Sequence, residues 1–221
     1  MKNLTLICLL LISTQTITAC KKKIISGKTD LTVFMYDMRT GEGIDGAQYE
    51  IFQSRGSYTE LSGSEIKEIT EGSLENGKAD INFKSKRLSN WVTIMRFPFL
   101  TEVYFYEGDY FEFVIDKFEK NHIEIPVLPM CDVTYHFKNT ACTSESNSMI
   151  YKRRHTLIDA EFGRWNPIPF TGCFDQISGP VQFPAGDYEI LMEVTKDGIT
   201  DVIPFSYTVH EDVNNIVELF Y

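Results

Sequence analysis

The sequence Leu31-Thr32-Val33-Phe34-Met35-Tyr36 places large apolar residues at every second position. Alternation with a period of two predicts a β-strand that turns one face toward a core. Similar short runs recur along the chain with turn signals about eight to twelve residues apart, and none sustains the spacing of an amphipathic helix. The sequence therefore predicts an all-β protein built from antiparallel sandwiches.

Strands are expected on both sides of this run. In the first half they are expected at residues 47–52, 79–83, 91–96, 103–106, 110–115 and 122–127. In the second half they are expected at residues 131–137, 152–161, 180–183, 188–194, 199–209 and 214–220. Residues 56–72 are polar and predict a long loop or a weak edge strand. Asn76-Gly77 and Lys196-Asp197-Gly198 predict tight turns, and Pro204 predicts an edge strand or a bulge.

The segment Ile125-Pro126-Val127-Leu128-Pro129 is the best candidate for a domain boundary, because its two prolines remove backbone donors between two strand-rich halves. We therefore expect a first sandwich at residues 30–127 and a second at residues 128–221. In the second half, Gly186-Asp187-Tyr188 resembles the tyrosine corner of immunoglobulin-like sandwiches, and Gly108-Asp109-Tyr110 echoes it in the first. The resemblance implies that the tyrosine hydroxyl bonds to an upstream backbone group.

Two segments of the first half carry a second resemblance. The octapeptides at residues 40–47 (TGEGIDGA) and 76–83 (NGKADINF) resemble the turn and hairpin of carboxypeptidase-regulatory-like or Cna-B-type repeats. The resemblance covers roughly residues 31–85 and implies a prealbumin-like β-sandwich, without implying an activity. Some Cna-B-type modules carry a Lys–Asn isopeptide bond whose formation an acidic residue assists. No such set of three residues can be placed on this sequence.

The first twenty residues predict where in the cell the protein is located. Lys2 and the apolar run from Leu4 to Ile12 have the layout of a secretory signal peptide, here residues 1–19, and the run is too short to span a bilayer. Ile17-Thr18-Ala19-Cys20 resembles the lipobox of bacterial lipoproteins. The resemblance implies acylation of Cys20, for example with palmitate, and attachment to a membrane of the cell envelope, the outer membrane being favoured. Residues 20–29 then form a short tether.

Five cysteines remain to be assigned. Cys8 belongs to the signal peptide and Cys20 to the lipid, whereas Cys131 begins an apolar face and is expected to be a buried thiol. Cys142 and Cys173 lie in polar, turn-like surroundings, so a disulfide between them is predicted for an exported protein. Spacing alone leaves the alternative of three thiols open.

Charge and motifs exclude several function classes. A net charge of −10 excludes nucleic acid as a partner. The glycines of residues 41–46 match a dinucleotide fingerprint, but a strand follows them instead of the required helix. No hydrolase motif occurs, and the four histidines have no metal-ligand spacing. We therefore predict no catalytic residue, no metal and no cofactor.

Aromatic residues offer the one distinctive surface. If Tyr104, Tyr106 and Tyr110 are exposed on adjacent strands, they form a platform for sugar rings or a protein partner, and Trp165 is a further contact point. The alternatives are that both strand faces are buried and that Trp165 packs its loop down. Lys152-Arg153-Arg154-His155 is a basic island that is either a solvated strand face or a contact for an acidic ligand.

These observations favour a non-catalytic, lipid-anchored envelope protein that binds a glycan or a protein partner as a binding or adhesion module. The alternative is a structural or accessory subunit of a surface assembly of the fimbrillin type. An envelope enzyme is the least favoured class, since no catalytic constellation occurs in the sequence.

Overall fold

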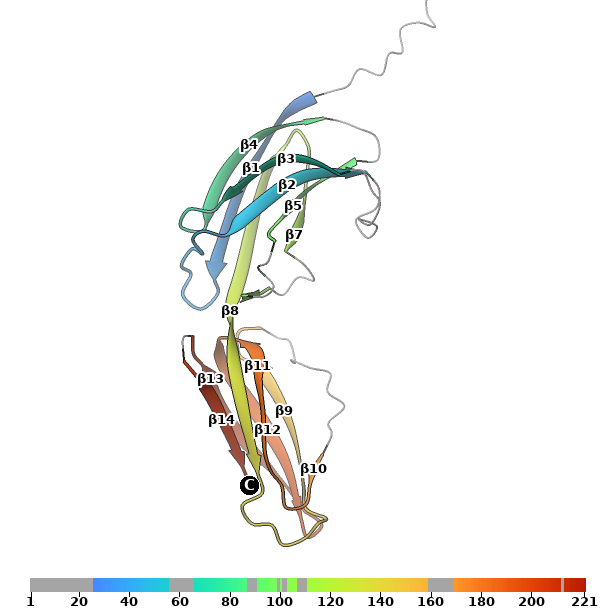
Figure 1. The fold of residues 1–221 in the computed structure, drawn as a ribbon, viewed down its shortest axis with the longest axis vertical. Helices are drawn as coiled ribbons and strands as arrows, with labels where there is room; N and C mark the ends of the chain where they lie inside the picture. The colour runs from blue at the N-terminus through green and yellow to red at the C-terminus, as the bar shows by residue number, and fades with distance from the viewer. Residues whose placement is uncertain are drawn as a thin grey trace, which may run out of the picture.

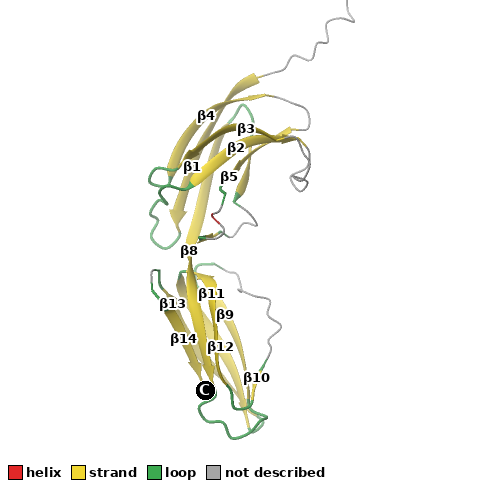
Figure 2. Ribbon diagram, viewed as in Figure 1, coloured by secondary structure: helices red, strands yellow, loops and turns green. Residues whose placement is uncertain are grey.

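Two β-sandwiches are stacked end to end along the long axis of the molecule (Figure 1). The computed structural model describes residues 26–55, 66–86, 91–98, 100, 103–106, 111–158, 169–211 and 213–221. Strands make up most of this described part, which contains no α-helix (Figure 2). Each sandwich encloses its own core: buried residues of the first come from positions 31–127 and those of the second from positions 133–221.

The first sandwich packs two sheets face to face. One sheet has the order β4 (Lys78–Lys86), β1 (Ser26–Asp37) and β8 (Lys120–Lys138), with the short β6 (Tyr104–Phe105) also paired to β8. The other has the order β3 (Ile66–Ser73), β2 (Gln48–Arg55), β5 (Trp91–Arg96) and β7 (Glu112–Ile115). Leu31, Val33 and Met35 are buried in the core between them, as the alternation of β1 predicted.

The second sandwich uses the second half of β8. There β8 lies between β11 (Asp175–Pro184) and β14 (Asn215–Phe220). The facing sheet has the order β10 (Phe170–Thr171), β9 (Ser148–His155), β12 (Gly186–Lys196) and β13 (Ile199–Val209). Its core is rich in aromatic rings, with Tyr135 of β8 in contact with Phe137, Phe183 and Tyr207.

Strand β8 is shared by both sandwiches. It runs without interruption for 19 residues, and Pro126 and Pro129 lie inside it. The sequence predicted two strands separated by a break, whereas the structure joins them. Pairing with β1 ends at Val127 and pairing with β11 begins at Met130, so Pro129 lies where β8 exchanges one partner strand for the other.

Most strand pairs are antiparallel, as expected for sandwiches of this class. Two pairs depart from this pattern: β1 and β14 both run parallel to β8. Parallel neighbours require a long crossover connection, which here is the rest of each sandwich. Local alternation predicts a strand without its direction, so the sequence could not show these pairings.

Several turn predictions are confirmed by the backbone. Asn76 and Gly77 have φ values of 49° and 76°, and Asp197 and Gly198 have values of 49° and 80°, as tight hairpin turns of the primed type require. The Tyr188 hydroxyl donates to the carbonyl oxygen of Pro184 at 2.7 Å, which confirms the tyrosine corner of the second sandwich. Tyr110, its counterpart, lies outside the described residues.

Cys142 and Cys173 form a disulfide with a Cα–Cα distance of 5.2 Å, the pairing that the sequence analysis favoured. The bridge joins the loop after β8 to the loop between β10 and β11, at the end of the second sandwich far from the first. Cys131 keeps its thiol and lies half-buried against the second core.

Candidate functional site

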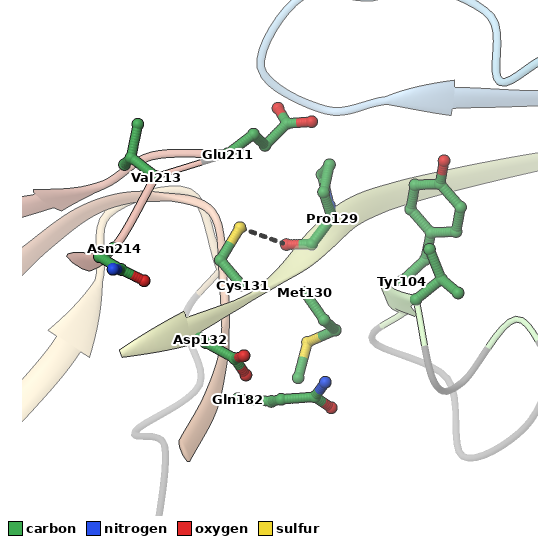
Figure 3. Close-up of a pocket in the computed structure, with 10 residues that line it drawn as sticks. Tyr104, Pro129, Met130, Cys131, Asp132, Gln182, Glu211, Val213 and Asn214 are labelled. Carbon is green, nitrogen blue, oxygen red and sulfur yellow. Dashed lines mark hydrogen bonds between the residues drawn. The ribbon is translucent and has the colours of Figure 1, made fainter. Parts of the chain in front are cut away.

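A groove of about 580 Å³ lies where the two sandwiches meet (Figure 3). The first sandwich contributes the segment around β6, β8 runs through the floor, and the second contributes β11 and the loop between β13 and β14. The lining residues are Val103, Tyr104, Pro129, Met130, Cys131, Asp132, Gln182, Glu211, Val213 and Asn214.

Backbone pairing brings Tyr104 to this groove. Tyr104 of β6 is in register with Pro129 of β8, and the Met130 N–H donates to the carbonyl oxygen of Val103 at 2.7 Å. These contacts hold the β6 segment against the part of β8 that leaves the first sandwich. Tyr104 is therefore half-buried, with its ring packed against the first core and its side chain on the groove wall.

A buried asparagine shapes the opposite wall. The Asn215 Oδ1 accepts the His210 N–H at 2.8 Å, and its Nδ2 donates to the carbonyl oxygens of His210 at 2.9 Å and Asp132 at 3.2 Å. One side chain thus closes the loop between β13 and β14 and ties it to β8. The loop then holds Glu211 and Val213 at the groove.

An ion-pair cluster beside the groove connects the two sandwiches. The Arg39 guanidinium contacts both Asp37 of the first sandwich and Glu211 of the second. Burial tends to raise the pKa of Asp37, but hydrogen bonds from the Arg39 side chain and backbone outweigh burial and hold it below its usual range. The pKa of Tyr104 is raised by burial and, further, by the nearby negative charges of Glu211 and Asp37.

The groove is lined by both apolar and acidic side chains. Its walls combine apolar side chains such as Val103 and Val213 with the acceptors of Asp132 and Glu211. Across the described residues, no three His, Cys, Asp or Glu side chains are grouped so as to hold a metal ion. An open groove of this kind fits an extended segment that offers apolar side chains and hydrogen-bond donors.

The structure separates the site residues expected from the sequence. Tyr104 lines the groove, whereas Tyr106 is half-buried with its ring 5.3 Å from that of Phe111 and 5.8 Å from that of Phe113. Both tyrosines pack against the first core instead of standing out from the sheet. Cys20, Tyr110 and Trp165 lie outside the described residues.

The basic island of β9 is divided between the two faces of the strand. On the outer face, Lys152 pairs with Glu193 at 3.5 Å and Arg154 donates to Glu189 at 2.7 Å. Arg153 points inward, where its guanidinium lies 3.9 Å from the centre of the Phe183 ring. Strand alternation therefore divides the island, and Lys152 and Arg154 each have an acidic partner on the outer face.

Sequence reasoning missed the Arg39–Glu211 contact and the groove it borders. These two residues are 172 positions apart, and neither belongs to a motif. The one local signal was the short turn at residues 210–213, which the sequence placed between two strands without assigning it a role.

Within the described part of the chain, no helix has the length and apolar character needed to cross a membrane. No protein-family model matches the sequence. A comparison with curated proteins likewise finds no match.

Among solved structures, the chain is similar to the Bacillus anthracis TIE protein, with 14% identity and a TM-score of 0.30 over 89% of this chain and 34% of that one. It is similar to GBS52, the minor pilin of Streptococcus agalactiae, with 10% identity and a TM-score of 0.32 over 88% of this chain and 94% of that one. It is also similar to the shaft pilin SpaA of Lactobacillus rhamnosus GG, with 10% identity and a TM-score of 0.33 over 89% of this chain and 97% of that one. The chain thus spans about a third of the TIE protein. At TM-scores this low the similarities carry no argument about function.

Proposed function

We propose that this chain is a non-catalytic, lipid-anchored structural subunit of a bacterial surface assembly, which holds its second sandwich away from the membrane. The observation that carries the proposal is the continuity of β8, a single 19-residue strand that belongs to both sandwiches. A shared strand joins the sandwiches without a separate linker, and ladder hydrogen bonds hold its backbone up to Val127 in the first sandwich and from Met130 in the second.

Further contacts support a stiff junction. The Met38 N–H donates to the Val127 carbonyl oxygen at 2.9 Å, on the side of the first sandwich. The Ala185 N–H donates to the Pro129 carbonyl oxygen at 2.7 Å, on the side of the second. Arg39 and Glu211 add an ion pair across the junction.

The position of the anchor supports the orientation. Ser26, the first residue of β1, lies at the end of the first sandwich that points away from the second (Figure 1). Cys20 precedes it by only six residues. Acylation of Cys20 would therefore hold the first sandwich near the membrane, and each buried methylene of the lipid contributes about 0.8 kcal/mol to attachment.

A second candidate function is the binding of a glycan or protein partner, and the groove between the sandwiches favours it. Tyr104 there presents a half-buried ring beside open polar acceptors. This function is compatible with the first, since a subunit of an assembly needs a contact surface.

Replacement of the anchoring thiol tests the proposal. In Cys20→Ala we expect loss of fatty-acid labelling, release from the membrane fraction and loss of cross-linked high-mass complexes on intact cells. The matched control is Cys8→Ala, which removes a thiol from the expected signal peptide and should keep all three properties. Unchanged labelling and fractionation in Cys20→Ala would contradict the anchor, and anchored protein without any such complexes would contradict the assembly role.

A further inference from the structure

Strand β13 is exposed on both faces. Residues 199–206 are all open to solvent, and the exposed fractions of Ile199, Val202, Ile203 and Phe205 are 69%, 60%, 39% and 36%. Ile203 and Phe205 belong to the face that is turned toward the core, and Val202 belongs to the opposite face. Apolar side chains therefore extend on both sides of an uncovered strand.

The edge of β13 is also long and regular. It pairs with β12 over eleven consecutive residues without a register shift and is the last strand of its sheet. Other edges of the described sheets are shorter or interrupted: β7 has four residues, and β11 has a register shift between Ser178 and Val181. Proteins usually protect such edges, because unpaired backbone groups invite another strand.

The register shows which backbone groups of β13 are free to pair. The Asp187 carbonyl oxygen accepts the Thr156 N–H at 2.9 Å, so odd-numbered residues of β12 point toward β9 and even-numbered ones toward β13. Because Tyr188 pairs with Tyr207, the even-numbered residues of β13 point to the open edge. These are Thr200, Val202, Pro204 and Ser206, and Pro204 has no N–H to offer.

Charge around this edge is low for a protein of net charge −10. Asp201 is the one charged residue of β13. On the outer face of the same sheet, Glu193 and Glu189 are paired with Lys152 and Arg154. A second copy of the chain can therefore approach this edge with little of the repulsion that the net charge would cause elsewhere.

We infer that β13 is a self-association edge, on which β13 of a second copy docks in antiparallel orientation about a two-fold axis at Val202. The inference rests on the proposed function, since it supplies the contact between subunits. In this register the two Val202 residues exchange both backbone hydrogen bonds, and the Thr200 N–H donates to Pro204 of the other copy. With the axis at Val202, Asp201 of one copy lies opposite Ile203 of the other. If the axis passed through Asp201 instead, the two Asp201 carboxylates would lie opposite each other.

The two-fold axis determines how the anchors are arranged. β13 lies along the long axis of the molecule, with Ile199 toward the far end of the second sandwich (Figure 1). Antiparallel pairing therefore points the two molecules in opposite directions, with their first sandwiches at opposite ends. Such a dimer joins two facing membranes.

Pro204 keeps the paired segment short, so each dimer contact is weak. Adhesion between the membranes therefore depends on many copies acting together.

Disulfide trapping tests the register. Paired residues of this type have Cα atoms about 5.5 Å apart, within the range that a disulfide spans. We expect mature Val202→Cys to form at least several-fold more cross-linked homodimer than Ile216→Cys under mild oxidation. Ile216 is a matched control because it lies on β14 of the same sandwich and is 65% exposed. Equal cross-linking of the two variants, or cross-linking of Val202→Cys to a different protein alone, would overturn the inference.

Clustering of phosphatidylcholine vesicles that carry the lipidated chain tests the orientation. Val202→Lys should abolish clustering, since a lysine at a strand edge blocks pairing, and Pro204→Thr should increase it by restoring a donor. Ile216→Lys should cluster as the parent does, and thermal melts confirm that each variant is folded. Clustering that Val202→Lys leaves unchanged would overturn the inference. Failure here is distinguishable from failure of the proposed function, because labelling of Cys20 is scored separately.

Discussion

His155 shows how a single buried group at the junction couples the fold to pH. Its side chain is 2% exposed, its Nδ1 accepts the Leu157 N–H at 3.1 Å and its Nε2 donates to the Ala185 carbonyl oxygen at 3.1 Å. This pattern requires the neutral imidazole. Burial lowers the pKa of His155 from its usual 6.5; the Ala185 carbonyl and Asp187 oppose the shift, and Arg39 adds to it.

We therefore expect the free energy of unfolding to fall as the pH falls below about 6.5 toward the lower pKa of the folded state. The unfolded chain takes up the proton first, so the stabilisation present above that pH is progressively lost. Urea unfolding between pH 8 and pH 5 measures the effect. His155→Gln should flatten the profile, whereas the exposed control His122→Gln should keep it. An equal slope in His155→Gln would show that another group titrates.

The alternation of each strand determines which of its charged side chains face solvent and which face the core. The basic island of β9 appears continuous in the sequence, yet Lys152 and Arg154 face solvent while Arg153 and His155 face the core. The same rule places Tyr188 at the start of β12 with its hydroxyl on Pro184. An element with a period of two therefore gives neighbouring residues unrelated roles.

The loops at the far end of the second sandwich depend on the disulfide. Cys142 and Cys173 are 31 residues apart in sequence, and a bridge that closes a loop of this size contributes about 3–4 kcal/mol. The double variant Cys142→Ser/Cys173→Ser should lose that amount in urea unfolding. Dithiothreitol should destabilise the parent by a similar amount and leave the double variant unaffected. A loss below about 1 kcal/mol would contradict the role assigned to the bridge.

At the scale of the whole molecule, the junction decides whether the two sandwiches behave as one body. β8 passes through it, and Arg39 contacts Glu211 beside it. Asp37 keeps Arg39 in place through an N–H···O contact of 3.0 Å from Nε and holds the guanidinium charged, since the hydrogen bond to Asp37 raises the pKa of Arg39.

Spin labels on the two sandwiches measure this stiffness. We expect labels at Ile66→Cys of β3 and Ile177→Cys of β11, both exposed, to give one narrow distance distribution in a Cys131→Ser background. Arg39→Ala should broaden it moderately, because β8 remains, and Lys28→Ala, which removes an exposed ion pair within one strand, should leave it unchanged. A broad distance distribution in the parent would contradict a stiff junction between the two sandwiches.

Much of the fold follows from residues that are close together in the chain. Alternation predicted β1 and the bounds of β5, and the turn residues Asn76-Gly77 predicted a hairpin with positive φ values. The polar run at residues 56–72 predicted a long loop or a weak edge strand, and the structure places the edge strand β3 in its second part, paired with β2. Such features depend on side-chain direction and on φ preferences, which act over a few residues.

The groove and the open edge depend on residues that are far apart in the chain. Arg39 meets Glu211, Tyr104 reaches β8 and the exposure of β13 follows from where the facing sheet ends. Alternation predicted β13 as a strand but could not show which of its faces would be covered. Local pattern specifies strands and turns, because each strand's own residues decide its two faces. Their partners, their direction and the surfaces left uncovered depend on long-range pairing, which no short stretch of the sequence records.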